Sequence, residues 1–329
     1  MKCKICNSGN YNTYEVREMM FGFKDKFLYL ECLGCGCLQI SQIPSKMSKY
    51  YPEEYYSYSL KLPNINYPKS GIKKIFAIHR DNFILFKKDL IGRIINLVYP
   101  NGYLKEELEH HFPAISDVFS VNKDTRVLDV GCGNGSFVYL LKEYGFQNCL
   151  GIDPYLQQDI VCPNGLRILK RTIHELDQTF DLIAFHHSFE HIADPLETFG
   201  SVQRLLSKEG VCLMRIPTVS SYAWKYYREN WVQLDAPRHF FLHSIQSIKL
   251  LAEKTHLKLV KVCYDSTAFQ FYGSEQYLKN IPLTSDRSYV KNKLASIFSE
   301  EEMASFKKKA IQLNLQNQGD SAAFYLKKV

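Results

Sequence analysis

The sequence predicts an α/β fold built around a mainly parallel sheet. From Thr125 onward, short apolar runs typical of strands alternate with segments of helical period. The first 45 residues differ, because they contain paired cysteines and short alternating runs that suit β-hairpins. Three regions are therefore expected: a small β module over 1–45 that is stabilised by a bound metal ion, a helical cap or linker over 46–120, and an α/β domain over 121–329.

Two C-x-x-C pairs define the N-terminal region. Cys3 and Cys6 form the first pair, and Cys32 and Cys35 form the second. Each pair offers two thiolates to one ion, so the four together predict a closed, structural Zn²⁺ site. The alternative, four unligated core cysteines, is disfavoured because so short a module cannot fold on a hydrophobic core alone. Cys37 is either a substitute ligand or, as we expect, a bystander.

The region 46–120 contains a tyrosine-rich stretch, YYPEEYYSYS, followed by a long segment in which helices are expected. Over 73–93, hydrophobic and cationic residues occur together at helical spacing. Such a segment suits peripheral contact with an anionic membrane or with a lipid-linked glycan. The more common alternative is a helical cap with a solvated basic face.

The α/β domain is expected to begin with five strands, interspersed with helices through FVYLLKEYG and PLETFGSVQRLLSKEG. The strands are RVLDVG, CLGID, LRILKRT, FDLIAFH and GVCLMRIP. SIQSIKLLAEKTH then has a helical period, and LKLVKVCYD and SAAFYLKKV are typical of strands. The polar and helical segment between these two, at about 265–318, is expected to be an insert.

The bulk composition fits a globular, cytoplasmic protein. The chain has 329 residues, of which 46% are hydrophobic and 23% are charged. Its first residues, MKCKICNSGN, lack the apolar core of a signal peptide, and no run of about 18 apolar residues predicts a membrane span. The formal charge of +7 permits an anionic substrate, such as a phosphorylated sugar or RNA, without requiring one.

A glycine-rich turn follows the first strand of the α/β domain. In VLDVGCGNGSF, Asp129 precedes three glycines at alternate positions. Glycines in such a turn let backbone N–H groups approach a ligand at the carboxyl edge of the sheet. The run lacks the lysine of a P-loop, and Ser136 stands where a dinucleotide fingerprint requires glycine or alanine. Both of those ligand classes fit poorly.

The pattern D-x-G-x-G-x-G, followed by GID at the end of the next strand, resembles class I S-adenosylmethionine (SAM) methyltransferases. The resemblance covers about 121–262 and the last strand. It implies a Rossmann-like, seven-stranded sheet in which strands one to five are parallel and the last is antiparallel. It also implies that the loop borders the methionine part of SAM and that Asp153 accepts hydrogen bonds from both ribose hydroxyls. The expected cofactor contacts are Asp129, Gly131, Gly133, Gly135, Asp153, Ile173 and His187.

Two further segments extend this resemblance. FDLIAFHHSFEHIADP carries an E-H-x-x-x-P run found after strand four in a broad methyltransferase group, and WVQLDAPRHFFLHS carries the W-x-x-x-D-x-P-R-H segment found after strand five. One position departs from the pattern, because Thr172 stands where many relatives carry an acidic residue near adenine. Backbone groups or His174 are expected to recognise the adenine amino group instead.

The chemistry predicts where the acceptor lies. Methyl transfer from a sulfonium is an in-line displacement, and an acceptor hydroxyl also needs a base that takes its proton. His186 to His191 follow strand four, beside the expected methyl position. The catalytic candidates are His191, Glu190 and His239, for which bracing a turn or packing against the cofactor are the structural alternatives. The substrate candidates are Tyr222, Trp224, Trp231 and Arg238, of which Arg238 either pairs with a phosphate or closes its loop with Asp235.

The paired cysteines resemble the zinc module that precedes the methyltransferase domain in sugar C-methyltransferases and related polysaccharide-pathway enzymes. The first hypothesis is therefore methylation of a small carbohydrate-type acceptor, a nucleotide sugar or a glycan intermediate, on oxygen or carbon. The second is an RNA methyltransferase that binds RNA through the zinc module. The third is a non-catalytic SAM-binding partner protein, against which the intact Asp129, glycines and Asp153 argue. The run His186 to Phe189 lacks the [DN]-P-P-[FY] pattern of nucleobase amino methylation, which disfavours the second hypothesis.

Overall fold

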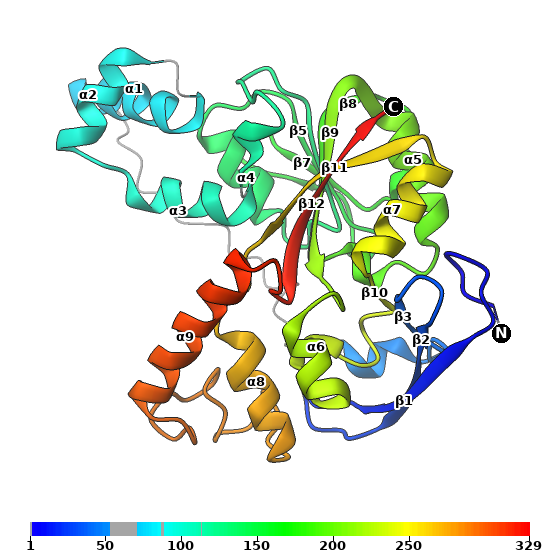
Figure 1. Ribbon diagram of the computed structural model, residues 1–329. Coiled ribbons are helices and arrows are strands. Elements are labelled where there is room, and N and C mark those ends of the chain that lie inside the picture. The colour runs from blue at the N-terminus through cyan, green and yellow to red at the C-terminus, as the bar shows by residue number, and fades with distance from the viewer. Residues whose placement is uncertain (1, 53–70, 87–88, 113) are drawn as a thin grey trace.

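The computed structural model describes residues 2–52, 71–86, 89–112 and 114–329 (Figure 1). Most of the tyrosine-rich stretch YYPEEYYSYS lies outside the described residues. None of the helices in the described ranges is long and apolar enough to span a bilayer.

An eight-stranded sheet in the order β11-β12-β9-β8-β4-β5-β7-β6 forms the centre of the fold. Its strands are β4 (Val127–Val130), β5 (Cys149–Ile152), β6 (Ile160–Val161), β7 (Arg167–Leu169), β8 (Phe180–His186), β9 (Leu206–Pro217), β11 (Leu257–Tyr264) and β12 (Ser321–Lys328). The five strands predicted to be parallel, β4, β5, β7, β8 and β9, pair in parallel. β12 lies antiparallel between β9 and β11. The sheet exceeds the seven expected strands because β6 adds a short antiparallel edge to β7.

Helices cover both faces of this sheet (Figure 1). α4 (Ser136–Glu143) packs on one face, and α5 (Pro195–Leu205) and α7 (Ile245–Lys254) pack on the other. Neighbouring residues of β8 face opposite layers, since Leu182 joins the core under α4 and Ile183 the core under α5. α5 ends before the residue predicted from the sequence, because Leu206 already pairs with Phe180 as the start of β9.

The N-terminal region forms the predicted hairpin and is joined to the α/β domain by a shared strand. β1 (Tyr11–Arg17) and β2 (Lys26–Cys32) pair antiparallel, and β3 (Leu38–Ile40) follows. The fourth strand of this sheet is β10 (Phe241–Leu242), which comes from the segment after β9. Side chains of both regions lie in one hydrophobic core, for example Tyr29 with Phe189.

The predicted helical cap consists of α1 (Ile72–Phe86), α2 (Leu90–Val98) and α3 (Gly102–His111). Asp89 caps α2 by accepting a hydrogen bond from the backbone of Gly92 at 2.8 Å. Gly92 allows α1 and α2 to approach closely, because a Cβ there would lie 1.9 Å from the carbonyl oxygen of His79.

The predicted insert after β11 is helical. It contains α8 (Phe269–Leu278) and α9 (Glu300–Leu315), and these lie near α6 (Tyr222–Tyr227) at one end of the sheet (Figure 1). Ser299 and Glu302 form a capping box that starts α9.

Candidate active site

The glycine-rich turn between β4 and α4 has a conformation that requires glycine. Gly131, Gly133 and Gly135 have φ values of 71°, 54° and 76°, which other residues rarely adopt. A Cβ on Gly131 would lie 2.5 Å from Cβ of Ser188, and one on Gly135 would lie 2.1 Å from Cδ1 of Ile168. The loop backbone therefore approaches the carboxyl edge of the sheet as closely as glycine permits.

Asp153 connects the end of β5 to this loop. Its Oδ2 accepts a hydrogen bond from the backbone N–H of Gly133 at 3.0 Å, and its Oδ1 accepts one from that of Tyr155 at 2.9 Å. Burial raises the pKa of Asp153, and these hydrogen bonds oppose the rise. Each carboxylate oxygen keeps a further lone pair, so Asp153 can accept two more hydrogen bonds beside the loop.

Asp129 lies on β4 beneath the same loop, and its environment favours a cationic ligand. The residue is 3% exposed, and its Oδ1 has no hydrogen-bond partner. Burial, and secondarily the negative charge of Asp153, raises the pKa of Asp129 to about 8. An unpaired buried carboxyl is costly, so a cation or a hydrogen-bond donor reaching Oδ1 would be stabilised there.

The structure also brings the expected adenine segment to this edge. Ile173 is buried and begins the turn η4 (Ile173–Glu175). The backbone N–H and the hydroxyl of Thr172 both donate to Glu175 at 2.7 Å, and Nδ1 of His174 lies 2.8 Å from Oγ of Ser201. These side chains are engaged locally, which favours recognition of the adenine amino group by backbone groups.

His187 follows β8 and is held by a chain of charged groups. Its Nε2 lies 2.8 Å from Nη1 of Arg215, which in turn pairs with Asp265. Arginine can only donate, so Nε2 of His187 accepts and Nδ1 carries the proton of the neutral ring. The preceding residue, His186, packs against the ring of Phe137 with centroids 4.6 Å apart, so it lies under the loop rather than beside His187.

Glu190 is completely buried in the turn η5 (Phe189–His191), and no described residue forms a hydrogen bond with either of its carboxylate oxygens. Oε1 lies 3.6 Å from Nδ1 of His187 and 3.9 Å from Nε2 of His239. Glu190, His191 and His239 each place one ligand atom within 4.8 Å of the others. Burial alone would raise the pKa of Glu190, but His187, His239 and His191 outweigh it and lower the pKa to about 2. The three predicted catalytic residues therefore lie together, and we call them the Glu–His–His cluster.

Backbone carbonyl groups orient both histidines of this cluster. Nδ1 of His191 lies 2.8 Å from the carbonyl oxygen of Arg238, and the hydroxyl of Tyr51 lies 3.4 Å from the same nitrogen. Nδ1 of His239 lies 2.8 Å from the carbonyl oxygen of Gln233. Carbonyl oxygens only accept, so each Nδ1 donates and each neutral ring presents a lone pair on Nε2. Burial, and secondarily the charge of His191, lowers the pKa of His239 to about 4, so this ring is neutral at physiological pH.

The guanidinium of Arg238 is engaged by groups of the protein itself. The side chain is fully buried. It donates to Asp235 at 2.5 and 2.9 Å, to Glu18 at 3.0 Å and to the carbonyl oxygen of Tyr50 at 3.1 Å. These partners engage the guanidinium and join its loop to the N-terminal region, so the structure favours the loop-closing alternative.

Two of the other predicted substrate residues, Trp224 and Trp231, are buried. Their indole groups donate hydrogen bonds of 2.9 Å to Glu31 and Asp320, respectively. Trp231 is fully buried, whereas Trp224 lines a pocket between the N-terminal region and α6. Tyr222 remains partly exposed, and Nζ of Lys309 lies 4.3 Å from the centre of its ring.

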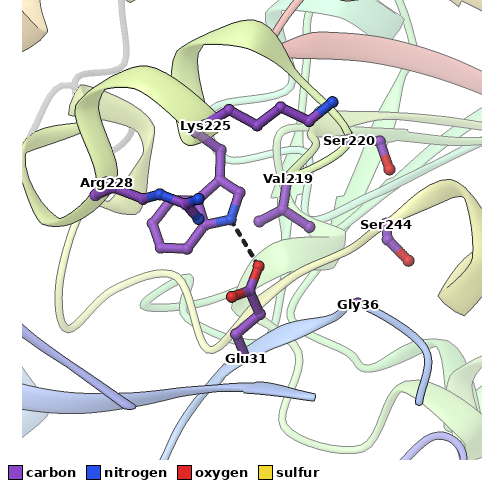
Figure 2. Close-up of a pocket in the computed structure, with 8 residues that line it drawn as sticks. Glu31, Gly36, Val219, Ser220, Lys225, Arg228 and Ser244 are labelled. Atoms are coloured by element: carbon purple, nitrogen blue, oxygen red, sulfur yellow. Dashed lines mark hydrogen bonds between the residues drawn. The ribbon is translucent and has the colours of Figure 1, made fainter. Parts of the chain in front are cut away.

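A pocket of about 360 Å³ lies between the N-terminal region and α6 (Figure 2). Glu31 of β2 lies opposite Arg228, whose guanidinium carbon is 5.3 Å from the ring centre of Trp224. Lys225 adds a second cation to the lining. The remaining lining residues are Gly36, Val219, Ser220, Trp224 and Ser244. The pocket therefore combines two cationic side chains with one carboxylate, and none of the cofactor candidates lines it.

The four predicted zinc ligands converge on one point. The Sγ atoms of Cys3, Cys6, Cys32 and Cys35 all lie within 4.8 Å of one another, and none of these residues forms a disulfide. Sγ of Cys37 instead lies 3.4 Å from the carbonyl oxygen of Leu242, as expected for a bystander. Four buried or half-buried thiols around one centre fit the donor set of a structural Zn²⁺ ion.

Three supporting residues were missed by sequence reasoning. Ser188 donates to the carbonyl oxygen of Val130 at 2.6 Å and so connects the turn η5, which holds Glu190 and His191, to the glycine-rich loop. Glu18 pairs with Arg238 across 220 positions, and no local pattern signals so distant a partner. Asp265 directly follows β11. This position just after a strand is the one sequence signal that could have placed Asp265 at the edge of the sheet.

Comparison with known proteins identifies the domain. Residues 91–262 match the family described as "Methyltransferase domain". This match spans more than half of the chain, which therefore belongs to that methyltransferase family. It covers the glycine-rich loop, Asp153 and the Glu–His–His cluster together. No curated protein matches the sequence.

Solved structures with a similar fold share little sequence with the chain. A cyclopropane synthase from Mycobacterium tuberculosis has 16% identity and a TM-score of 0.40, with 62% of this chain and 78% of that chain covered. A SAM-dependent methyltransferase from Archaeoglobus fulgidus has 18% identity and a TM-score of 0.42, with coverages of 72% and 99%. Coclaurine N-methyltransferase has 16% identity and a TM-score of 0.41, with coverages of 68% and 72%.

Proposed function

We propose that this protein transfers a methyl group from SAM to an oxygen or carbon of a small carbohydrate-type acceptor, such as a nucleotide sugar or a glycan intermediate. The observation that carries the proposal is the adjacency of two sites. Ser188 joins the glycine-rich loop, where SAM is proposed to bind, to the turn that holds Glu190 and His191. A methyl donor and a proton-accepting cluster therefore share one edge of the sheet.

The residues present fit SAM, which supplies an electrophilic methyl group on a sulfonium. The backbone of the glycine-rich loop can approach the methionine part closely, and the unpartnered Oδ1 of Asp129 suits its ammonium group. Asp153 has the lone pairs to accept both ribose hydroxyls, and Ile173 offers an apolar surface for adenine. His187 completes the proposed contacts.

The Glu–His–His cluster accounts for activation of the acceptor. An acceptor hydroxyl must lose its proton as it attacks the methyl group. The neutral ring of His239 can accept this proton, and the carboxyl group of Glu190, 3.9 Å from Nε2, would stabilise the imidazolium that forms. In the pocket between the N-terminal region and α6, Lys225 and Arg228 favour an anionic acceptor such as a sugar diphosphate.

Incubation with methyl-labelled SAM and a lysate of the source cells tests this function. Label is expected in the small-molecule or lipid-extractable fraction. Label that is sensitive to ribonuclease would contradict the carbohydrate proposal and favour the alternative of an RNA methyltransferase that uses the zinc module for nucleic-acid binding. SAM binding without labelled product in any fraction would favour the non-catalytic alternative.

SAM binding at pH 7 is expected to release about one proton from Asp129. The pKa of this buried carboxyl is about 8 in the free protein, so the group is mostly protonated at pH 7. An ammonium group beside Oδ1 favours the ionised form and lowers the pKa, which releases the proton. Calorimetry in buffers of different ionisation enthalpy measures the release, and it should vanish at pH 9, where Asp129 is already ionised. Equal proton release by an Asp129→Asn variant would contradict this assignment.

Peripheral membrane contact through 73–93 remains a proposal, and the exposed faces of α1 and α2 support it. Nine large apolar side chains on these helices are exposed, namely Ile72, Ile75, Phe76, Ile78, Leu90, Ile91, Ile94, Leu97 and Val98. Lys73, Lys74 and Arg93 are exposed on the same helices. Apolar and cationic side chains together suit an anionic membrane surface, where a lipid-linked acceptor would be found.

Co-sedimentation with vesicles measures this contact. The protein is expected to bind phosphatidylglycerol vesicles. Added salt should weaken this binding, and binding to phosphatidylcholine vesicles should be weaker. The double substitution Leu90→Ser and Ile91→Ser should reduce binding at least about fivefold, because it removes exposed apolar area that would enter the membrane. The matched pair Ile311→Ser and Leu315→Ser on α9, which is equally apolar and exposed, should not. Equal losses for both pairs would contradict a specific role of α2.

A further inference from the structure

The Glu–His–His cluster contains a buried carboxyl group that forms no hydrogen bond with the described part of the chain. Glu190 is fully buried, and both of its oxygens are without a hydrogen bond. The nearest donor, Nδ1 of His187, is 3.6 Å away and thus beyond hydrogen-bond distance. Asp235 adds a second carboxylate 3.8 Å from Nε2 of His239. A buried carboxyl group without a hydrogen bond, beside a second carboxylate, offers a place where a cation would be stabilised.

The two histidines present their nitrogens as metal ligands do. Metal-binding histidines typically donate the other ring N–H to a backbone carbonyl or a carboxylate, which fixes the ring. Here Nδ1 of His191 and Nδ1 of His239 both meet backbone carbonyl oxygens at 2.8 Å. The lone pairs on both Nε2 atoms are therefore available, and Oε1 of Glu190 lies 3.9 Å from that of His239.

The backbone around the cluster is also fixed. The N–H of Phe240 donates to the carbonyl oxygen of Glu190 at 2.8 Å, which ties the two segments that supply the three side chains. The hydroxyl of Tyr29 donates to the carbonyl oxygen of His239 at 2.8 Å. Ligands of one ion at about 2.1 Å lie roughly 3 to 3.5 Å apart, so modest side-chain movements close the site.

We propose that Glu190, His191 and His239 bind a divalent transition-metal ion such as Mn²⁺ or Fe²⁺. Two imidazoles and one carboxylate suit these ions and leave coordination positions open. Two adjacent hydroxyls of a sugar can fill such positions as a chelate. The proposal that the ion binds depends only on the geometry of the cluster, whereas the use of the ion in catalysis rests on the proposed function.

In the reaction, the bound ion lowers the pKa of the coordinated acceptor hydroxyl, whose proton passes to water. The resulting oxygen attacks the methyl carbon, an O–C bond forms, and the C–S bond breaks. The sulfur keeps the electron pair of that bond, and S-adenosylhomocysteine leaves. Glu190 and both histidines act as ligands in this reaction, and the ion, rather than a side-chain base, activates the acceptor hydroxyl.

The cysteine site does not compete for the same ion. Thiolates are soft ligands that select Zn²⁺, whereas the nitrogen and oxygen set of the cluster also accepts Mn²⁺. Titration of zinc-loaded protein with Mn²⁺ therefore isolates the new site, and the signal of free Mn²⁺ in electron paramagnetic resonance measures its occupancy. Removal of metals by strong chelators is avoided, because it would also strip the cysteines.

We expect one Mn²⁺ per chain in the zinc-loaded protein. Glu190→Gln and, separately, His191→Asn should each weaken Mn²⁺ binding at least tenfold while the zinc content stays unchanged. Glu190→Gln keeps the shape of the side chain and His191 is only half-buried, so at least one variant should fold. His79→Asn is the matched control, because it removes a histidine that pairs with a carboxylate, Asp89, outside the cluster. Absence of bound Mn²⁺, or equal binding by the wild type and both cluster variants, would overturn the proposal.

Calorimetry with SAM on the same samples separates this proposal from the proposed function. SAM binding without Mn²⁺ binding would overturn the metal site alone. Mn²⁺ binding without SAM binding would overturn the proposed function and leave the metal site standing. If both bind, methyl transfer should rise at least tenfold on Mn²⁺ addition in the wild type and not in Glu190→Gln; an unchanged rate would overturn the catalytic use of the ion.

Discussion

Replacing Asp153 with alanine is expected to weaken SAM binding by at least about 100-fold. The carboxylate is proposed to accept both ribose hydroxyls, and the loss of charge-assisted hydrogen bonds of this kind costs about 3 kcal/mol. The substitution also removes the acceptor that holds the backbone N–H of Gly133 at 3.0 Å, so the loop itself loosens. Titration calorimetry of the purified protein with SAM measures the loss.

Two variants sharpen this test. Asp153→Asn keeps one acceptor oxygen and should show an intermediate affinity. Asp177→Ala removes an exposed carboxylate on the same domain and should leave the affinity unchanged. A folded Asp153→Ala variant that binds SAM as tightly as the wild type would show that the ribose lies elsewhere.

Replacing Cys32 with serine is expected to abolish stoichiometric zinc binding and to lower Tm by at least about 10 °C. A structural zinc site contributes folding free energy directly, because the unfolded chain does not hold the ion. The loss should not stay local, since β3 pairs with β10 and both regions share one core. β10 lies two residues after His239, so methyl transfer should fall along with Tm.

Metal analysis and thermal unfolding measure the two effects. Cys37→Ala is the matched control, because Cys37 is buried nearby but lies outside the four-cysteine group. It should keep one zinc per chain and lose only a few degrees of Tm. Wild-type protein that is purified without chelators and contains no zinc would contradict a structural zinc site.

Local patterns predicted the sheet well because each strand carries its own signal. The parallel order of β4, β5, β7, β8 and β9 follows from apolar strands that alternate with helices. The short β6 was not predicted, because two residues have no period to detect. The start of β9 was missed because apolar Leu205 and Leu206 suit either a helix or a strand.

The candidate site was predicted where its residues follow strands and missed where they pair across the fold. Asp129, Asp153 and Glu190 stand at or just beyond strand ends, which meet at one edge of a parallel sheet. The burial of Arg238 depends on Glu18, which follows β1 in the N-terminal region and has no local signal. Sequence alone does not show whether an aromatic ring is covered, so it did not separate Trp224, which lines the pocket, from the fully buried Trp231.

β10 belongs to the N-terminal sheet although it follows β9 in the chain. This arrangement limits how the protein can be divided or recombined. Cys37 and Leu242, which meet at that strand, are 205 positions apart. A chimaera that takes only residues 1–45 from a related enzyme would join a foreign β3 to the resident β10, and their cross-strand side chains would not match. The smallest unit that can be exchanged intact therefore comprises two separate pieces of chain, the cysteine-rich segment and the strand at 241–242.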